Sequence, residues 1–111
     1  MTRRQRRALG AVAVLLAAAS PAGSGALAET IRIEAKNLAF VPASITAHVG
    51  DTIEWVNGDF VVHTATARNG DWDVKLGPHA TGQTVVQKPG TIEYYCRYHP
   101  NMKGEVTIAP E

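Results

Sequence analysis

Hydrophobic and polar residues alternate with a period of two along most of the chain beyond residue 29. Segment 30–36 places Ile31, Ile33 and Ala35 on one face and three charged residues on the other. This alternation is typical of a β-strand that buries one face and exposes the other. Alternation or a β-prone composition predicts further strands over 44–49, 52–56, 61–67, 83–87, 91–96 and 105–109.

Turn sequences separate these segments. Gly50-Asp51, Asn57-Gly58-Asp59 and Lys88-Pro89-Gly90 each follow a predicted strand, and such clusters of glycine, proline, asparagine and aspartate mark chain reversals. Pro42 interrupts the alternation and suits a sheet edge or a turn, because proline has no backbone N–H to donate to a neighbouring strand. Short strands joined by tight turns are therefore expected.

The stretch 68–82 is the least regular part of the chain after residue 29. Trp72, Val74 and Leu76 share one parity there and indicate a brief strand or a flap. No segment shows helical periodicity of any length. Seven or eight short strands at roughly ten-residue spacing predict an all-β fold, either an antiparallel sandwich or a barrel.

Residues 1–28 have a different pattern. Four arginines lie within the first seven residues, an apolar run covers 8–19, and Ala26-Leu27-Ala28 supplies small residues. These features are typical of a secretory signal peptide, and the apolar run is shorter than the roughly 20 residues of a membrane span. We expect export to the periplasm, cleavage after Ala28, and no membrane span in the mature form.

Removal of the signal peptide changes the charge of the chain. The full sequence has 11 Lys and Arg against 10 Asp and Glu, and four of the arginines lie in the signal. The mature part, 29–111, therefore has 7 basic and 10 acidic side chains, a net charge of −3 with neutral histidine. This balance gives no support for nucleic-acid binding. Its 83 residues suffice for one domain with a single core, expected to be monomeric.

The most informative stretch is 94–104, which contains the single cysteine. Cys96, His99 and Met102 follow one another at a C-x2-H-x2-M spacing. A lone thiol is unusual in an oxidising compartment. Cys96 is therefore either a small apolar residue of the core or a thiolate that is protected by a bound metal. Two histidines, one cysteine and a weak axial methionine are the ligands of a blue-copper electron-transfer site. Zinc is disfavoured, since a thioether is a poor zinc ligand.

The fourth ligand is expected to be a histidine from another strand. His63 lies in segment 61–67, 33 residues before Cys96, so a separate strand can carry it to the ligand loop. Cys96 has the inward parity of its own strand, which places the sulfur between the sheets. His48 has outward parity and His79 lies in a loop without a partner at ligand spacing. Both are therefore expected on the surface.

With these residues the mature chain resembles the cupredoxins, the small blue-copper fold of plastocyanin, pseudoazurin and amicyanin. The matching segments are 50–57, His63-Thr64, 89–96 and 96–104. The interval of two residues between His99 and Met102 is similar to the short loop of amicyanin. The resemblance implies an eight-strand Greek-key sandwich with one type 1 copper ion at one end, bound by His63, Cys96, His99 and Met102.

One position departs from the family pattern. Many cupredoxins have asparagine directly after the first ligand histidine, where its side chain ties the two ligand-bearing segments together, and this chain has Thr64. The Thr64 N–H can still donate to the Cys96 sulfur. Such neighbouring hydrogen bonds orient ligands and tune a metal, so the resemblance predicts the type of site and leaves its potential open.

Three functions compete at such a site. The first is a non-enzymatic electron carrier that cycles between Cu(I) and Cu(II), with His99 as the exit for the electron. The second is copper delivery, storage or resistance, which the sulfur ligands would allow because they suit Cu(I). Proteins that hand over copper tend to use open sites with several Met or Cys residues, whereas the mature part has one of each. The third, a fragment of a multicopper oxidase or nitrite reductase, would need further histidines and a second domain. We expect the electron carrier.

The expected partners are two redox proteins, one that donates the electron and one that accepts it. By resemblance to amicyanin these would be a periplasmic dehydrogenase and a c-type cytochrome. Arg97 and Lys103 flank the ligand residues, which predicts a partner surface with an acidic rim.

Overall fold

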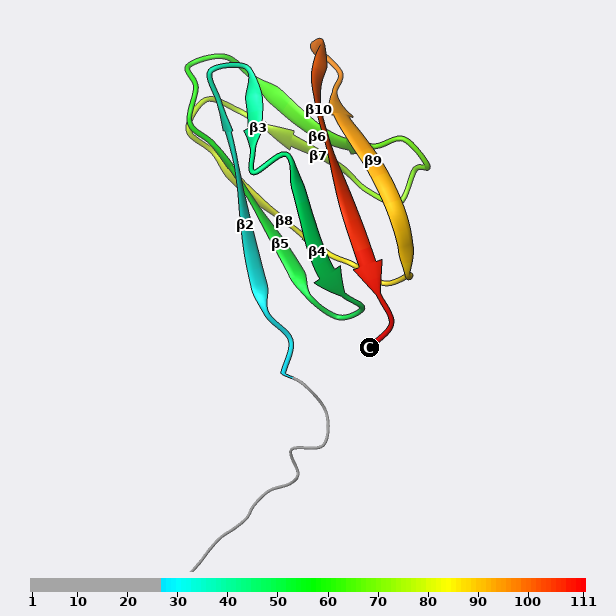
Figure 1. Cartoon of the computed structure of the whole chain (residues 1–111). Coiled ribbons are helices and arrows are strands. Elements are labelled where there is room, and N and C mark those ends of the chain that lie inside the picture. Colours follow the sequence, from blue (N-terminus) through cyan, green and yellow to red (C-terminus); the bar gives the residue numbers. More distant parts are fainter. Residues whose placement is uncertain (1–26) are drawn as a thin grey trace, which may run out of the picture.

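The computed structural model describes residues 27–111 and shows an all-β sandwich, as predicted. The signal peptide expected over 1–28 lies outside the described residues except for its last two positions. No helix in the described range has the length and hydropathy needed to cross a membrane. Nine strands are present in this range (Figure 1): β2 (Thr30–Lys36), β3 (Ala39–Val41), β4 (Ser44–His48), β5 (Thr52–Asn57), β6 (His63–Ala67), β7 (Asp73–Leu76), β8 (Thr81–Val85), β9 (Gly90–Cys96) and β10 (His99–Ala109).

The strands form two sheets. One has five strands in the order β4-β10-β9-β6-β7, and the other has four in the order β3-β2-β5-β8. The chain crosses between the sheets repeatedly, since β4 belongs to the larger sheet while β3 and β5 belong to the smaller one. The β2–β5 and β4–β10 pairs are parallel. Alternation within a strand cannot reveal this, because it reports which face is buried and not which strand lies alongside.

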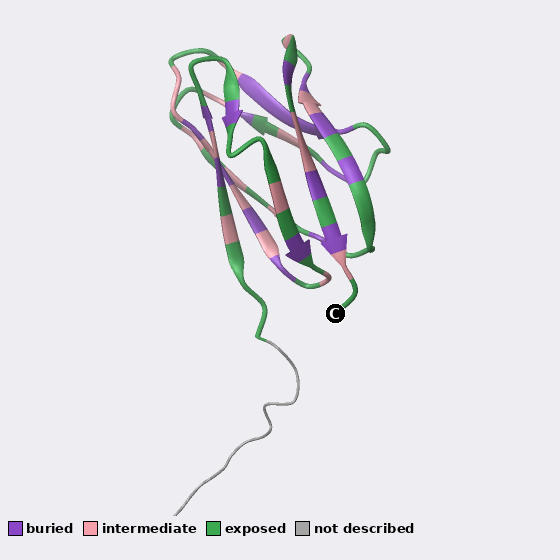
Figure 2. Ribbon diagram, in the orientation of Figure 1, coloured by how far each residue is buried: buried purple, intermediate pink, exposed green. Residues whose placement is uncertain are grey.

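The core lies between the two sheets, where the inward faces of their strands meet. Figure 2 shows buried and exposed residues alternating along β2, β9 and β10. Trp55 occupies the middle of the core, with its ring centroid 4.9 Å from that of Tyr94 and 6.2 Å from that of Phe40, both edge to face. Aromatic pairs in this geometry stabilise a core beyond the effect of burying their area. The inward parities predicted for β2, β5 and β9 are confirmed.

Most of the predicted strands differ from the structure by one or two residues at a boundary, and a larger difference occurs in β10. β3 is a short edge strand that ends just before Pro42, β8 begins at Thr81 instead of residue 83, and β10 begins at His99 instead of residue 105. The brief strand expected in the irregular stretch is present as β7. The early start of β10 matters most for function. Because of it, the residues predicted to form a ligand loop form a tight turn followed by an irregular strand.

Candidate metal centre

Three of the four predicted ligand residues lie together at one end of the sandwich. The metal-binding atoms of His63, Cys96 and His99 are all within 4.8 Å of one another. Cys96 Sγ lies 3.7 Å from His63 Nδ1 and 3.6 Å from His99 Nδ1. The two imidazole rings are 5.0 Å apart between centroids and inclined at 69°. One sulfur and two nitrogen donors thus surround a common point.

The ends of three strands bring these donors together. His63 is the first residue of β6, Cys96 the last of β9 and His99 the first of β10. β9 lies between β6 and β10 in the larger sheet, so the three strand ends meet at the same end of that sheet (Figure 1). Cys96 and His99 face each other in the ladder across the turn formed by Arg97 and Tyr98.

Met102 is placed by an irregularity in β10. The pairing shifts between His99, opposite Cys96, and Lys103, opposite Tyr95, which leaves residues 100–102 without ladder partners. Bulges of this kind redirect side chains next to functional sites. Met102 is buried in the core while its neighbours Asn101 and Lys103 are exposed.

Burial separates the donors into an inner group and one outer residue. His63 and Cys96 are fully buried, at 0% exposed, and Met102 is nearly so. His99 is only partly buried. A charge that enters or leaves the cluster therefore has its shortest path to solvent through the His99 ring.

Asp59 holds His63 from the side opposite the cysteine. His63 Nε2 lies 2.9 Å from Asp59 Oδ2, and because an ionised carboxylate only accepts, Nε2 carries the proton and Nδ1 faces Cys96 with a free lone pair. Asp59 also accepts the backbone N–H groups of Asn37 and Leu38. Burial raises the pKa of Asp59, but the hydrogen bonds from His63, Asn37 and Leu38 outweigh burial and lower it to about 2.

Asn57 fixes the loop that carries Asp59. It is buried at the end of β5, its Oδ1 accepts the Asp59 N–H at 2.8 Å, and its Nδ2 lies within 3.1 Å of three backbone carbonyl oxygens, those of Val61, Leu76 and Gly77. Sequence reasoning treated residues 57–59 only as a turn and missed both side chains. A signal was present, because Asn57 has the same inward parity as Ile53 and Trp55, where a polar residue needs partners.

Thr64 joins the two segments that carry the donors. Its N–H donates to Cys96 Sγ at 3.4 Å, and its Oγ1 accepts the Arg97 N–H at 2.9 Å. The tie that many cupredoxins make with an asparagine side chain is therefore made here by a threonine hydroxyl. Hydrogen bonds to groups around a metal orient its ligands and tune its properties.

The other two histidines lie outside the cluster, as expected. His48 is exposed at the far end of the sandwich, where its ring is 3.9 Å from Asp51. His79 is exposed in the loop between β7 and β8, and its ring packs edge to face on Phe60 at 4.6 Å.

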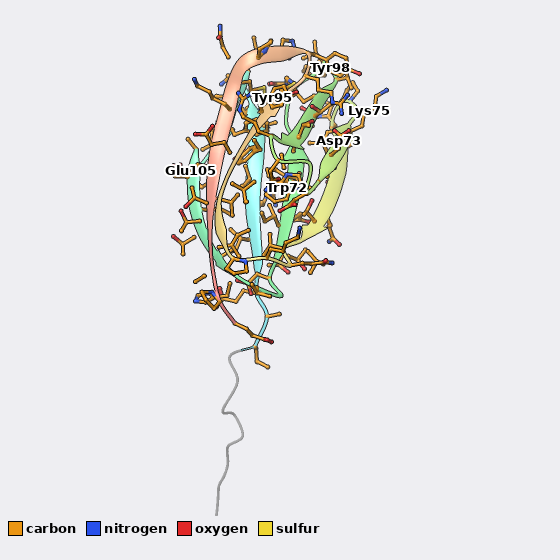
Figure 3. All side chains as sticks on the ribbon, turned by 90° about the vertical axis from the view of Figure 1, so that its right-hand side faces the viewer. Trp72, Asp73, Lys75, Tyr95, Tyr98 and Glu105 are labelled. Carbon is orange, nitrogen blue, oxygen red and sulfur yellow. The ribbon has the colours of Figure 1, made fainter. Side chains whose placement is uncertain are left out.

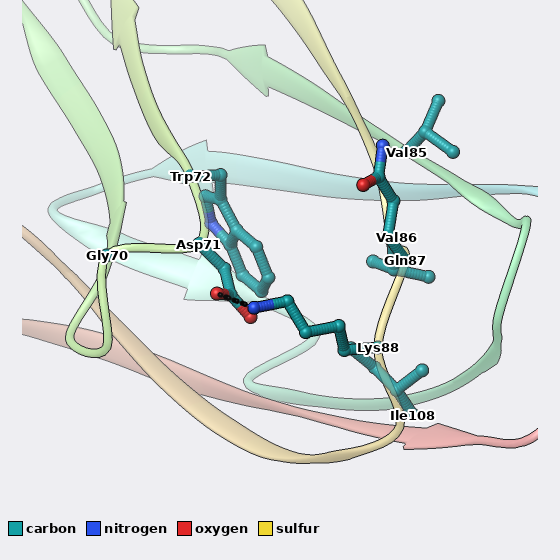
Figure 4. Close-up of a pocket in the computed structure, with 8 residues that line it drawn as sticks. All are labelled: Gly70, Asp71, Trp72, Val85, Val86, Gln87, Lys88 and Ile108. Atoms are coloured by element: carbon teal, nitrogen blue, oxygen red, sulfur yellow. Dashed lines mark ion pairs between the residues drawn. The ribbon is translucent and has the colours of Figure 1, made fainter.

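A cavity of about 270 Å³ lies away from the donor cluster, at the opposite end of β6 from His63. Figure 4 shows Trp72, Val86 and Ile108 on its walls and the Lys88–Asp71 ion pair, at 3.6 Å, at its mouth. The cavity shares no residue with the cluster. This cavity is therefore not placed to hold a substrate next to the donor atoms.

Comparisons with known proteins agree with this geometry. The cupredoxin-like domain family matches residues 8–108. Amicyanin-alpha from Methylorubrum extorquens is 29% identical over 107 residues, covering 91% of this chain and 90% of that protein. Amicyanin from Paracoccus versutus is 24% identical over 87 residues, covering 73% and 66%. The structure of a purple cupredoxin from Nitrosopumilus maritimus has a TM-score of 0.64 at 26% identity, covering 71% of this chain and 99% of that one.

The donor set fits copper. A buried sulfur, two imidazole nitrogens and a nearby thioether are the donors found in trigonal copper sites with a weak axial ligand. Asp59 keeps the His63 Nδ1 lone pair directed at the cluster, and Thr64 supplies a donor to the sulfur. The fold, the cluster and the family match over most of the chain agree with one another. The chain belongs to the cupredoxin-like family and is a copper electron-transfer protein similar to amicyanin.

Proposed function

We propose that residues 29–111 form a single periplasmic domain that carries one electron at a time between redox partners. His63, Cys96, His99 and Met102 are the ligands in this proposal, and the bound copper supplies the Cu(I)/Cu(II) couple. The observation that carries the proposal is the buried convergence of one thiol and two imidazoles within 4.8 Å. The periplasmic location rests on the signal peptide predicted for 1–28.

The surroundings of the cluster favour electron transfer over copper exchange. Asp59 fixes the His63 ring, and Thr64 fixes Cys96 and the following turn. Ligands locked by packing and neighbouring hydrogen bonds change position little between metal states. A donor set that is largely closed to solvent is suited to keeping copper, whereas delivery would need an open path for the ion.

Exposed apolar side chains lie in turns at the same end of the sandwich as His99. They come from three turns at this end of the sandwich (Figure 1): Leu38 between β2 and β3, Phe60 and Val61 between β5 and β6, and Tyr98 between β9 and β10. Phe60 is 84% exposed although its ring packs edge to face on His79. We call these four residues the apolar rim. A small surface of this kind suits the weak, low-area contacts of redox partners.

Four cations belong to strands or turns at this end of the sandwich, and one of them, Arg97, is paired with Asp73. Lys36 ends β2, Lys75 pairs with Thr64 across β6 and β7, Arg97 follows Cys96, and Lys103 follows Met102. They are four of the seven basic residues in 29–111, although that part of the chain is acidic overall. The partner surface is therefore proposed to carry acidic groups around an apolar centre.

Replacing His99 by alanine is expected to slow electron exchange by at least about tenfold, because it removes a ligand and opens the partly buried side of the cluster to water. Stopped-flow measurement of electron exchange with a c-type cytochrome checks this. His48→Ala is the matched control, since His48 is an exposed histidine at the far end of the sandwich, away from the apolar rim and outside the cluster. Equal rates for wild type and His99→Ala would contradict the proposed exit.

Association with an acidic redox partner is expected to slow as salt is raised from about 0.01 M to about 0.1 M, where the screening length falls from about 30 Å to about 10 Å. Lys103→Gln should flatten this dependence. Lys88→Gln removes the same charge at the far end, where Lys88 pairs with Asp71, and should leave the dependence as in wild type. A rate independent of salt would argue against the acidic partner.

The absorption and EPR spectra of residues 29–111 loaded with Cu(II) test the proposed function directly. An intense blue band with narrow copper hyperfine splitting is expected, because the Cys96 thiolate would bind copper. A pale protein with an ordinary tetragonal signal, or one that holds only Cu(I), would favour copper delivery, storage or resistance instead.

A further inference from the structure

A ring of hydrogen bonds leads from the turn after Cys96 to an ion pair on the surface. The Arg97 N–H donates to Thr64 Oγ1 at 2.9 Å, Thr64 Oγ1 lies 2.8 Å from Thr66 Oγ1, and Thr66 Oγ1 donates to Asp73 Oδ1 at 2.8 Å. The Arg97 side chain closes the ring, with Nη2 2.6 Å from Asp73 Oδ2.

The chemistry of the groups fixes the direction of every bond in this ring. A carboxylate only accepts, so Thr66 gives its single hydroxyl proton to Asp73. Thr66 must then accept from Thr64, and Thr64 keeps a lone pair for the Arg97 N–H. All donors point along one path toward the carboxylate, and hydrogen bonds arranged in this way strengthen one another.

The inner half of the ring is buried and the outer half is exposed. Thr64 and Thr66 are buried between β7 and β9, whereas the Asp73 and Arg97 side chains are about half exposed. Figure 3 shows Asp73 on the side of the sandwich, close to Lys75 and below Tyr98. A buried hydroxyl without a partner is costly, so the surface carboxylate completes the hydrogen bonding of the two inner residues.

We propose that Thr66 and Asp73 are positioning residues that act on Cys96 through Thr64. Thr64 is held from two sides, by its N–H on Cys96 Sγ and by its hydroxyl in the ring. Anchoring the hydroxyl fixes how closely the N–H approaches the sulfur. A donor on the sulfur favours the electron-rich Cu(I) state and raises the reduction potential. This inference rests on the proposed ligation of copper by Cys96.

The decisive variant is Thr66→Val, which removes the bridging hydroxyl without changing charge. The reduction potential is expected to fall by about 41 mV. This corresponds to about a fivefold change in the one-electron equilibrium constant, at 59 mV per tenfold change. In the copper-free protein the Arg97 amide should exchange with solvent about tenfold faster. Thr66→Ser restores a hydroxyl and should restore the wild-type value of both quantities.

Thr84→Val is the matched control. Thr84 Oγ1 accepts the Trp55 indole N–H at 3.0 Å in the other sheet, so this change also removes a hydroxyl from a hydrogen bond but leaves the ring intact. It should lower thermal stability without shifting the potential or the Arg97 exchange rate. Equal shifts of potential in Thr66→Val and Thr84→Val would mean general loosening and would overturn the proposal, as would wild-type behaviour of Thr66→Val.

Asp73→Ala tests the surface end of the ring by Arg97 amide exchange alone. The matched change is Glu93→Ala, which removes a carboxylate from the exposed Arg68–Glu93 pair at 3.8 Å. Only Asp73→Ala should speed the Arg97 exchange, and equal rates in the two variants would overturn the role of Asp73. Because this measurement needs no copper, failure of the ring and failure of the proposed electron carriage give different results.

Discussion

Cys96→Ser is expected to abolish the blue charge-transfer band and to slow electron exchange by at least about 100-fold. The loss of a group that only neighbours a metal ligand typically costs about 10- to 100-fold, and Cys96 would be the ligand with the most covalent bond to copper. A serine hydroxyl is a hard oxygen donor that stays protonated near neutral pH, whereas the soft thiolate suits both copper states. Absorption, EPR and stopped-flow exchange of the copper-loaded variant provide the measurement.

Met102→Leu separates loss of the thiolate from general damage to the site. Leucine fills a similar volume, so the exchange should cost less than about 1.5 kcal/mol of stability. The axial methionine is a weak ligand that tunes the potential, so this variant should keep the intense band and shift the potential. An intense band that survives Cys96→Ser, or that disappears equally in Met102→Leu, would contradict the proposed ligand roles.

The parts of the fold that depend on local pattern were predictable from the sequence. Ile33 and Trp55 sit at inward positions because their strands alternate, and both are fully buried. The C-x2-H-x2-M spacing predicted that Cys96 and His99 would belong to one ligand loop, and the two residues face each other in the ladder. Each of these features is set by residues within one segment, where a period or a spacing carries the information.

The parts that depend on the approach of distant segments were not predictable in the same way. Residues 99–104 do not alternate between apolar and polar side chains, so the start of β10 was missed. The contact between Thr66 and Asp73 depends on the pairing of β6 with β7. Thr64 was noticed as a departure from the family, but its acceptor role needs the position of Arg97, 33 residues away.

Asp59 and Thr64 together explain how the donor side chains of the cluster are oriented. They contact different donors from different sides: Asp59 holds the far nitrogen of His63, and Thr64 holds the sulfur of Cys96. The loop bearing Asp59 is fixed in turn by Asn57, and the hydroxyl of Thr64 by Thr66. His63 and Cys96 are therefore oriented by separate sets of hydrogen bonds. Loss of one set should affect the residue that it orients more than the other.

Asp59→Ala is expected to weaken copper binding by about 10- to 100-fold, the usual cost of removing the partner of a metal-binding histidine. Without the carboxylate, the His63 proton is no longer held on Nε2, and the tautomer with the proton on Nδ1 competes with copper binding. Asn37 and Leu38 also lose an acceptor for their N–H groups. Competition with a Cu(I) chelator measures the affinity, and thermal unfolding of the copper-free protein measures stability.

The matched control is Asp51→Ala at the far end of the sandwich, where Asp51 accepts the backbone N–H groups of Glu29 and His48. Those hydrogen bonds lower the pKa of Asp51, as others do for Asp59. The Asp59 pKa falls from 3.8 to about 2 on folding, so its ionised form stabilises the protein above about pH 4 and this contribution is lost as the pH falls toward 2. The stability difference between wild type and Asp59→Ala should therefore shrink over that range. Only Asp59→Ala should also lose copper affinity, and equal affinity losses in the two variants would show that Asp59 acts on overall stability and not on His63.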